Sequence, residues 1–242
     1  MARHVKNKKK NRHGTAFWDR EYTNAEHLAL SEEASGDLMK FCRWLERRSK
    51  RTLLNPLNSA IDLGCGNGRN LIYLARNFGM RGVGYDSSAA AIKEAIRLST
   101  DLNLEFQTRS MAGELTVPDE SQTLALDMMS SHFLKQDERL LLRNEIHRVL
   151  KPGGFLFMKT FLSDGDLHTK RLIEEAPGDE PGSYIHPVIG VQEYVYSEAE
   201  LTAFLEEQFI VHKVYTSHKH VSKGKAWKRR TISIYAEKDP YE

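Results

Sequence analysis

Cysteine is scarce in this sequence, since only Cys42 and Cys65 occur among its 242 residues. Two cysteines exclude a disulfide framework, and these two lack the paired spacing of a cysteine metal site. Long apolar runs are also missing, because no stretch approaches the roughly 18 residues that a membrane-spanning helix needs. The basic N-terminus has no apolar core behind it, which argues against a secretory signal. We therefore expect a cytoplasmic protein that does not span a membrane.

Acidic residues are absent from two stretches of the chain. Residues 1–13 carry six Lys/Arg and residues 208–236 carry seven, both without an acid. The rest of the chain then has 22 Lys/Arg against 33 Asp/Glu, a charge near −11, although the whole chain is at +2. Either residues 1–13 and 213–230 bind a polyanion such as RNA, or they form a solvated tail and a basic edge hairpin.

The length fits one α/β domain with some elaboration. We expect residues 1–14 to be a disordered basic tail, residues 15–54 a helical cap and residues 55–242 the main domain. Within the cap, Phe17, Trp18 and Tyr22 favour a short amphipathic helix. A second helix is predicted at about residues 35–49, with Leu38, Phe41, Cys42 and Leu45 on its apolar face.

Short apolar runs alternate with helical periods from residue 60 onward. The predicted strands cover residues 60–63, 82–85, 104–108, 124–129 and 155–161, and the predicted helices cover 70–78, 89–99 and 138–150. Residues 163–193, rich in Gly, Pro and acids, are expected to form a long inserted loop or lid. A helix at 197–208 and strands at 209–217 and 231–237 follow, the strands forming a hairpin at the sheet edge. This pattern predicts a single doubly wound, Rossmann-like α/β fold with a seven-stranded sheet, mostly parallel with an antiparallel C-terminal edge hairpin.

A glycine-rich segment, Asp62-Leu-Gly64-Cys-Gly66-Asn-Gly68, lies between a predicted strand and a predicted helix. Glycines let the backbone turn tightly and approach a ligand, and the helix N-terminus offers free N–H donors. A dinucleotide fingerprint would place its third glycine at position 69, where Arg69 stands. The acid before the glycines favours a cationic ligand such as S-adenosylmethionine over a pyrophosphate. We therefore predict that Asp62, Gly64, Cys65, Gly66, Asn67 and Gly68 bind this cofactor, with Cys65 a small buried filler rather than a nucleophile.

Polar residues at the ends of the next strands extend this predicted site. Asp86, followed by Ser87, ends the second strand, where a carboxylate meets ribose hydroxyls in doubly wound folds. Ser110 and Met111 follow the third strand at the expected place of the adenine, and Asp127 and Met128 end the fourth. For Asp86 and Asp127 an ordinary strand-end turn is the alternative. His132 either touches the ligand or packs locally.

Aromatic and basic side chains at the two ends of the chain complete the set of candidates. Trp18 and Tyr22 either cover the methionine end of the cofactor or only pack their helix on the domain. In the basic hairpin, His218 and Arg230 are candidates for binding an anionic substrate or accepting a proton. His218 and His220 have no acidic or cysteine partner nearby, so we predict no metal site.

The ordered set of motifs resembles the class I S-adenosylmethionine-dependent methyltransferase superfamily over roughly residues 55–160. The set comprises the glycine segment, Tyr85-Asp86, Asp127 and the turn Leu150-Lys-Pro-Gly-Gly154. The chain also resembles the tellurite-resistance methyltransferases in the segment from Asp62 to Asn70, in Tyr196-Ser-Glu-Ala-Glu-Leu201, and in Arg230 before the last strand. In that family a histidine shortly before the last strand is implicated in catalysis, and His218 matches it by its offset from Gly224. The resemblance implies an enzyme that uses S-adenosylmethionine and yields S-adenosylhomocysteine.

The identity of the methyl acceptor separates the remaining hypotheses. A small-molecule or metalloid acceptor under the 163–193 segment is the first, with in-line transfer to an aligned acceptor. An RNA or ribosome-associated protein acceptor, held by the basic tail and hairpin, is the second. A methyltransferase-like binding module without catalysis is the third. The glycine spacing makes an NAD-dependent oxidoreductase the weakest interpretation.

Overall fold

The computed structural model describes residues 14–27, 30–50, 52–217, 221–222, 225–226 and 228–241. The predictions on residues 1–13, His218 and His220 lie outside these residues. In the described part of the chain, no helix combines the length and apolar character needed to cross a bilayer.

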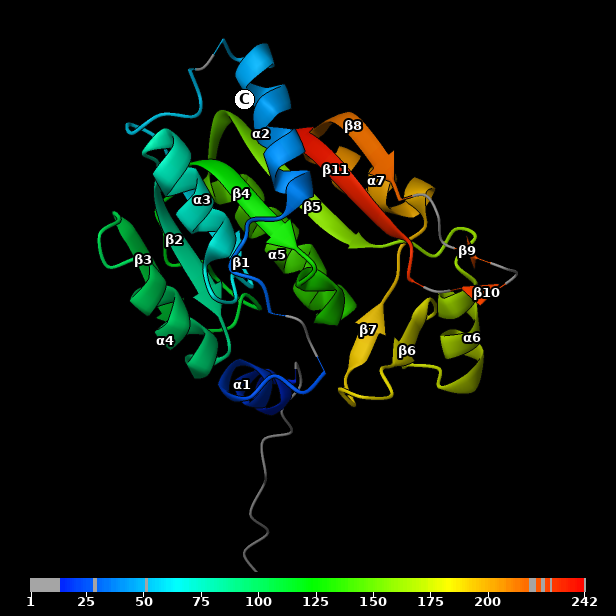
Figure 1. The fold of residues 1–242 in the computed structure, drawn as a ribbon. Coiled ribbons are helices and arrows are strands. Elements are labelled where there is room, and N and C mark those ends of the chain that lie inside the picture. The colour runs from blue at the N-terminus through cyan, green and yellow to red at the C-terminus, as the bar shows by residue number, and fades with distance from the viewer. Residues whose placement is uncertain are drawn as a thin grey trace, which may run out of the picture.

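A seven-stranded sheet in the order β3-β2-β1-β4-β5-β11-β8 organises the fold (Figure 1). Its strands are β1 (Ser59–Leu63), β2 (Arg81–Asp86), β3 (Leu104–Thr108), β4 (Gln122–Met128), β5 (Leu150–Phe161), β8 (Ile210–Thr216) and β11 (Thr231–Glu237). β1 to β5 pair in parallel, whereas β11 pairs antiparallel with both β5 and β8. The predicted fold class is confirmed, including the antiparallel hairpin at the edge.

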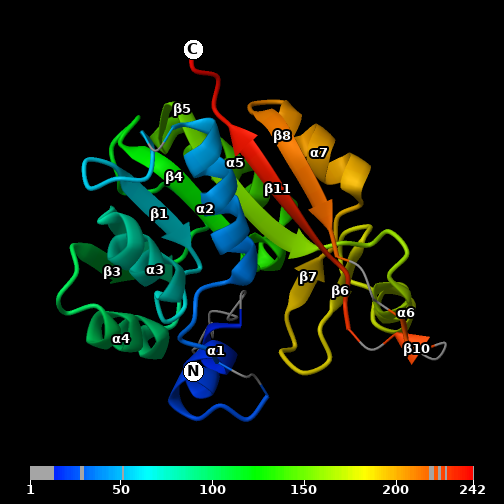
Figure 2. The ribbon, with the colours of Figure 1, turned by 45° about the horizontal axis from the view of Figure 1, so that its top comes forward.

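Helices cover both faces of this sheet (Figure 2). One face carries α2 (Gly36–Arg48), α3 (Arg69–Phe78) and α4 (Ala89–Leu98), and the other carries α5 (Gln136–Val149) and α7 (Glu198–Glu206). The short helix α1 (Thr15–Thr23) and the 3₁₀ turn η1 (Ser131–Phe133) lie at the edge where the parallel strands end. Since loops after parallel strands meet at this edge, it is the expected place of a ligand site.

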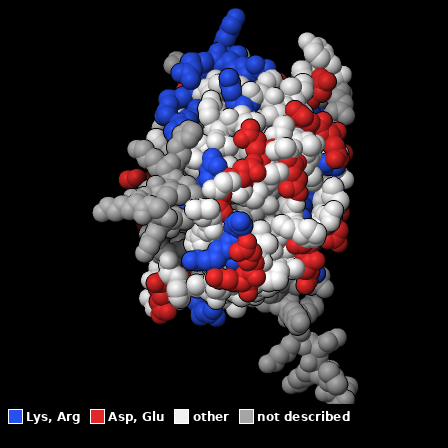
Figure 3. All heavy atoms as spheres, turned by 90° about the vertical axis from the view of Figure 1, so that its right-hand side faces the viewer, with Lys and Arg blue, Asp and Glu red and all other residues white. Residues whose placement is uncertain are grey.

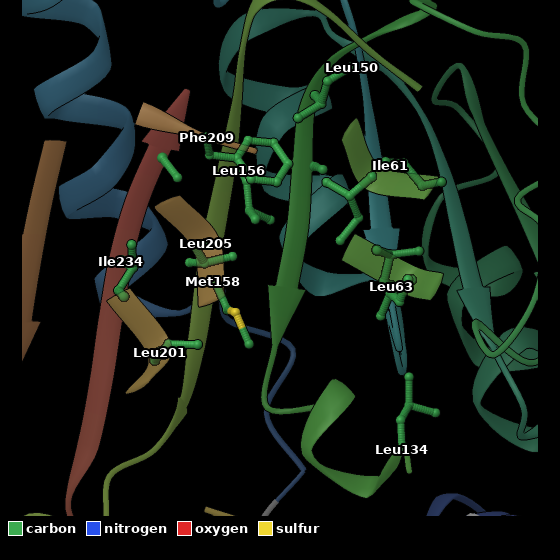
Figure 4. Close-up of a cluster of buried hydrophobic side chains, with 14 of the residues drawn as sticks. Ile61, Leu63, Leu134, Leu150, Leu156, Met158, Leu201, Leu205, Phe209 and Ile234 are labelled. Atoms are coloured by element: carbon green, nitrogen blue, oxygen red, sulfur yellow. The ribbon is translucent and has the colours of Figure 1, made fainter. Parts of the chain in front are cut away.

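Two apolar clusters hold the helices to the sheet. Figure 4 shows one of them, in which Leu201 and Leu205 of α7 lie against Leu156, Met158 and Ile234 of the sheet. On the opposite face the predicted apolar side of α2 is buried, and Phe41 stacks on Phe157 with ring centroids 5.0 Å apart. Full burial of such side chains contributes about 1.5–3 kcal/mol each, so α2 is an integral part of the domain.

The turn at Lys151 to Gly154 differs in detail from the predicted stop before a strand. β5 begins at Leu150, which pairs with Gln122, and pairing with β4 resumes with Phe155 opposite Leu124. The intervening residues bulge out of the ladder, and Gly153, with φ at 73°, donates its N–H to the carbonyl of Lys238 at 3.0 Å. Glycine tolerates this left-handed backbone at no steric cost.

The prediction of a loop at residues 163–193 is wrong. This segment contains α6 (Leu167–Glu175) and an antiparallel pair, β6 (Ser183–Ile185) with β7 (Gln192–Tyr194). The Asp166 side chain caps α6 by accepting hydrogen bonds from the N–H groups of His168 and Thr169 at 2.8 and 3.0 Å. A separate apolar cluster, with Tyr184 fully buried, packs the pair against α6. A second small hairpin, β9 (Val221–Ser222) with β10 (Lys225–Ala226), lies between β8 and β11 in the chain.

Candidate active site

The glycine segment forms a tight turn between β1 and α3. Gly64, Gly66 and Gly68 have φ values of 74°, 56° and 75°, which side chains of L residues rarely adopt. A Cβ on Gly64 would overlap Ser130, a Cβ on Gly66 would overlap the Tyr22 hydroxyl, and a Cβ on Gly68 would lie 2.6 Å from Phe106. All three positions therefore require glycine, both for the backbone angle and for space.

A cavity of about 380 Å³ opens beside this turn. Its lining includes most residues predicted to bind the cofactor: Trp18, Tyr22, Gly64, Cys65, Gly66, Asn67, Asp86, Ser87, Ser110, Met111 and Met128. The structure thus brings the ends of β1, β2, β3 and β4 together with α1. Among the described residues of the prediction, Asp62, Gly68 and Asp127 do not line the cavity.

The Asp86 carboxylate is fixed at the wall of the cavity. One oxygen accepts a hydrogen bond from the Gly66 N–H at 2.9 Å, and the other accepts one from the Ser88 N–H at 2.8 Å. Burial raises the pKa of Asp86, although both N–H groups favour its ionised form. The side chain therefore joins the end of β2 to the glycine turn and faces the cavity in a defined orientation.

Two further acids lie behind the turn. Asp62 is 1% exposed, and one of its carboxyl oxygens has no hydrogen-bond partner among the described residues. Burial and the neighbouring Asp86 raise the pKa of Asp62 to about 7. Asp127 is also buried, but it accepts hydrogen bonds from the Ser130 hydroxyl at 2.8 Å and the Ser131 N–H at 3.1 Å, so it holds the turn after β4. Burial and the nearby Asp62 raise the pKa of the Cys65 thiol, which keeps it protonated.

Helix α1 is held over the cavity by a residue that the sequence analysis missed. Asp19 accepts hydrogen bonds from the Ser88 hydroxyl at 2.6 Å and the Ala90 N–H at 3.2 Å, at the N-terminus of α4. Phe17 is buried beneath α1, whereas Trp18 and Tyr22 line the cavity. The helix therefore both packs on the domain and contributes to the site.

Other lining residues were also missed by the sequence analysis. They are Leu30, Ser31, Ser35, Arg69, Asn70, Tyr85, Arg109, Met129, Ser130, Phe133, Leu134 and Lys159. Lys159, near the end of β5, donates to the Asp37 carboxylate of α2 at 2.5 Å. Partial burial alone would raise the pKa of Asp37, but hydrogen bonds from Lys159 and Lys40 outweigh it and lower that pKa.

His132 lies next to the cavity without lining it. Its ring packs on Phe133 and Phe161, with centroids 4.2 and 5.2 Å away, so the interpretation of local packing is the one that fits. Burial lowers the pKa of His132 to about 4. A buried ion pair lies nearby, in which Arg229 donates to Glu193 at 2.7 Å, and Glu193 also accepts a hydrogen bond from the Tyr184 hydroxyl.

Of the two predicted catalytic residues, Arg230 lies within the described part of the chain. The Arg230 guanidinium donates to the carbonyls of Asp164 and Ser217, and Arg230 does not line the cavity. His218 lies outside the described residues. Within the described ranges, no three His, Cys, Asp or Glu side chains are grouped to hold a metal ion.

Comparisons with known proteins agree with this geometry. Residues 60–154 match the family described as a methyltransferase domain. A fatty-acid O-methyltransferase of Mycolicibacterium smegmatis is 33% identical over 96 residues, which are 39% of this chain and 34% of that protein. The chain thus spans about one third of the length of this curated relative.

Solved structures share the fold. An S-adenosylmethionine-dependent methyltransferase of Methanosarcina mazei has a TM-score of 0.65 at 24% identity, covering 80% of this chain and 97% of its own. The 1,6-didemethyltoxoflavin-N1-methyltransferase of Burkholderia thailandensis, solved with S-adenosylhomocysteine and 1,6-didemethyltoxoflavin bound, has a TM-score of 0.65 at 18% identity, covering 93% and 87%. The chain therefore has the fold of class I S-adenosylmethionine-dependent methyltransferases, and its residues 60–154 match the methyltransferase domain family.

Proposed function

We propose that this protein is a class I S-adenosylmethionine-dependent methyltransferase that acts on a small-molecule acceptor. The observation that carries the proposal is the Asp86 carboxylate, which the Gly66 and Ser88 N–H groups fix at the wall of a cavity beside a three-glycine turn. A carboxylate at the end of β2 is the group that binds ribose hydroxyls in doubly wound folds.

The residues present fit this cofactor. Gly64 and Gly66 of the glycine turn line the cavity with their backbone, and the N-terminus of α3 beside it favours a carboxylate. The buried carboxyl group of Asp62, one oxygen of which has no hydrogen-bond partner among the described residues, provides negative potential for a cationic ligand when it is ionised. Ser110 and Met111 are proposed to contact the adenine, and Trp18 and Tyr22 to cover the methionine end.

When bound, the cofactor supplies a methyl group on a positively charged sulfur, which is already activated for transfer. The chain then has to exclude water, hold the acceptor in line and, for a protonated acceptor, take up its proton. α1 and η1 are placed to exclude water, because Trp18 and Phe133 both line the cavity with their ring centroids 5.8 Å apart. His218 is our first candidate for the proton acceptor and Arg230 for binding an anionic acceptor.

A small molecule is favoured as the acceptor because three apolar residues of the lining, Met129, Phe133 and Leu134, lie together just after β4. The curated relative, by its name, methylates fatty acids. A carboxylate acceptor would be ionised at neutral pH and need no general base. The resemblance to tellurite-resistance methyltransferases makes a metalloid oxyanion the second small acceptor to test.

Two measurements test the proposal. Calorimetry with S-adenosylmethionine should detect binding that Asp86→Asn weakens about 10- to 150-fold, since a hydrogen bond to a charged group contributes about 1.5–3 kcal/mol. Asp101→Asn, an exposed acid after α4, is the matched control and should bind like the wild type. Absence of binding to the folded wild-type protein would refute the cofactor assignment.

A screen with a labelled methyl donor then tests the acceptor. Fatty acids, thiols, metalloid oxyanions and total RNA are offered to the wild-type protein in parallel. Transfer to a small molecule supports the proposal, transfer to RNA alone replaces it by the second hypothesis, and binding without any transfer favours the non-catalytic module.

A further inference from the structure

A second hollow lies between α2 and the edge strands of the sheet. This groove has a volume of about 530 Å³. Its wall on α2 consists of Asp37, Lys40, Arg43, Trp44 and Arg47. Its opposite wall, on β8, β11 and the residue after β8, consists of Tyr215, Thr216, Ser217, Thr231, Ser233 and Tyr235. In Figure 2, α2 lies on one face of the sheet next to β11, and β8 is the strand beyond β11. The α2–β8 groove is not used by the proposed reaction.

One wall of the groove carries an excess of positive charge. Arg43, Arg47 and Lys50 are exposed, and within the described ranges none of them forms an ion pair. Asp37, the acid of the lining, is already bound by Lys40 at 2.8 Å and Lys159 at 2.5 Å. Figure 3 shows Lys and Arg gathered at the upper end of the molecule, where α2 ends in Figure 1. The patch favours an anionic ligand, although the bulk of the chain is acidic.

Acidic residues near the patch offset only part of its charge. Glu237 is bound by Arg48 at 3.1 Å and by His212 at 2.5 Å, and Glu46 lies beside Arg43 and Arg47. Since the charge of Glu237 is already balanced, Glu46 is the acid that faces Arg43, Arg47 and Lys50, and these three cations outnumber it.

The groove also presents aromatic rings. Tyr215 is 51% exposed, and its ring lies 5.3 Å from that of Tyr235, which in turn lies 5.2 Å from the half-buried ring of Trp44. Lys213 and Tyr215 are two positions apart on β8, so their side chains point to the same face of the sheet. One side of the Tyr215 ring packs on Tyr235, and the exposed remainder is available for stacking.

The groove and the cofactor cavity share a wall. Asp37 lines the groove and Lys159 lines the cavity, and the two side chains are joined by their ion pair. The end of the groove at Asp37 is therefore adjacent to the cavity, while Arg43 and Arg47 lie further along α2. An extended ligand can follow α2 toward the cavity.

We infer that the α2–β8 groove binds a single-stranded nucleic acid, with phosphates on Arg43 and Arg47 and a base on Tyr215. Cationic side chains that follow the backbone, combined with aromatic faces for unpaired bases, are the features with which proteins bind single strands. A duplex keeps its base faces stacked inside and cannot use Tyr215. The inference concerns binding and goes beyond the proposed methyl transfer.

Fluorescence anisotropy with a labelled 12-nucleotide single-stranded RNA tests the inference on the full chain. The double variant R43E/R47E should bind at least tenfold more weakly at 50 mM salt. The slope of log K against log salt concentration should also be shallower than that of the wild type by about 1.4, the value for two lost phosphate contacts. Tyr215→Ala should weaken binding about 5- to 150-fold, as expected for one lost stacked base. Residues 1–13 are present in every variant, so the differences report on the groove.

A charge-matched control separates the groove from general basicity. K93E/K170E reverses two exposed lysines, on α4 and α6, and should bind RNA like the wild type. The inference is overturned if the wild type does not bind, if the control loses as much affinity as R43E/R47E, or if Tyr215→Ala has no effect. Equal affinity for a 12-base-pair RNA duplex, or for an acidic peptide of equal charge, would also overturn it. A DNA strand of the same sequence shows whether the sugar contributes.

Discussion

The glycine turn allows a quantitative test of why its first glycine is required. In Gly64→Ala the new residue must adopt φ near 74°, which costs about 1–2 kcal/mol for an L residue. Its Cβ would also overlap the Cβ of Ser130, and relieving such overpacking costs about 1–3 kcal/mol. We therefore expect Gly64→Ala to lower the free energy of unfolding by about 2–5 kcal/mol.

Gly190 provides the matched control for this change. Its φ is 69°, close to that of Gly64, but an added Cβ would meet nothing within 4 Å. Gly190→Ala should therefore lower the free energy of unfolding by only about 1–2 kcal/mol, the backbone contribution. The difference between the two variants isolates the steric contribution at Gly64.

A double-mutant cycle identifies the obstructing side chain. Ser130→Gly removes the overlapping atom, so Gly64→Ala should be less destabilising in that background by at least about 1 kcal/mol. Urea unfolding followed by circular dichroism, with free energies from linear extrapolation, gives all four values. Equal costs for Gly64→Ala and Gly190→Ala, or additive effects of Gly64→Ala and Ser130→Gly, would refute the reasoning.

Three further predictions address the charges around the site. Because the pKa of Asp62 is raised to about 7, its carboxyl group ionises as pH rises through 7 and then attracts the cationic cofactor. The affinity for S-adenosylmethionine, measured by calorimetry, should therefore increase from pH 6 to pH 8. In Asp62→Asn this increase should be smaller. Glu193→Gln leaves the buried Arg229 without its counter-charge and should lower the free energy of unfolding by about 3–5 kcal/mol. Glu94→Gln, which removes the partner of the exposed Arg97 at 2.6 Å on α4, should cost under about 1 kcal/mol in urea unfolding. Asp19→Ala removes two hydrogen bonds that hold α1, so stopped-flow fluorescence should show about tenfold faster cofactor dissociation; an unchanged rate would contradict the role of α1 as a cover.

The sheet could be predicted from the sequence because its information is local. Each buried parallel strand is a short apolar run, and each connecting helix shows its own period. The residues around the cavity could be predicted for the same reason, since Asp86, Ser110 and Met128 each lie at the end of a predicted strand. Parallel strands place their ends at one edge, so a linear pattern is enough to bring these positions together.

The features that were missed depend on pairing between distant segments. Lys159 and Asp37 are 122 positions apart, and Asp19 meets Ser88 across 69 positions. Neither pair has a local signature. The strands β6 and β7 have only three residues each, too few to show an alternation among the surrounding glycines and prolines. Composition alone therefore predicted a loop where the chain forms a helix and a hairpin.

The position of β11 between β5 and β8 has a consequence for the synthesis of the chain. A ribosome makes β8 before β11, yet β8 joins the sheet only through β11. Until residues 231–237 have left the ribosome, the unpaired edges of β5 and β8 present free backbone groups, which favour aggregation. The sheet can therefore be completed only after β11 has been made, and its two edges need protection until then.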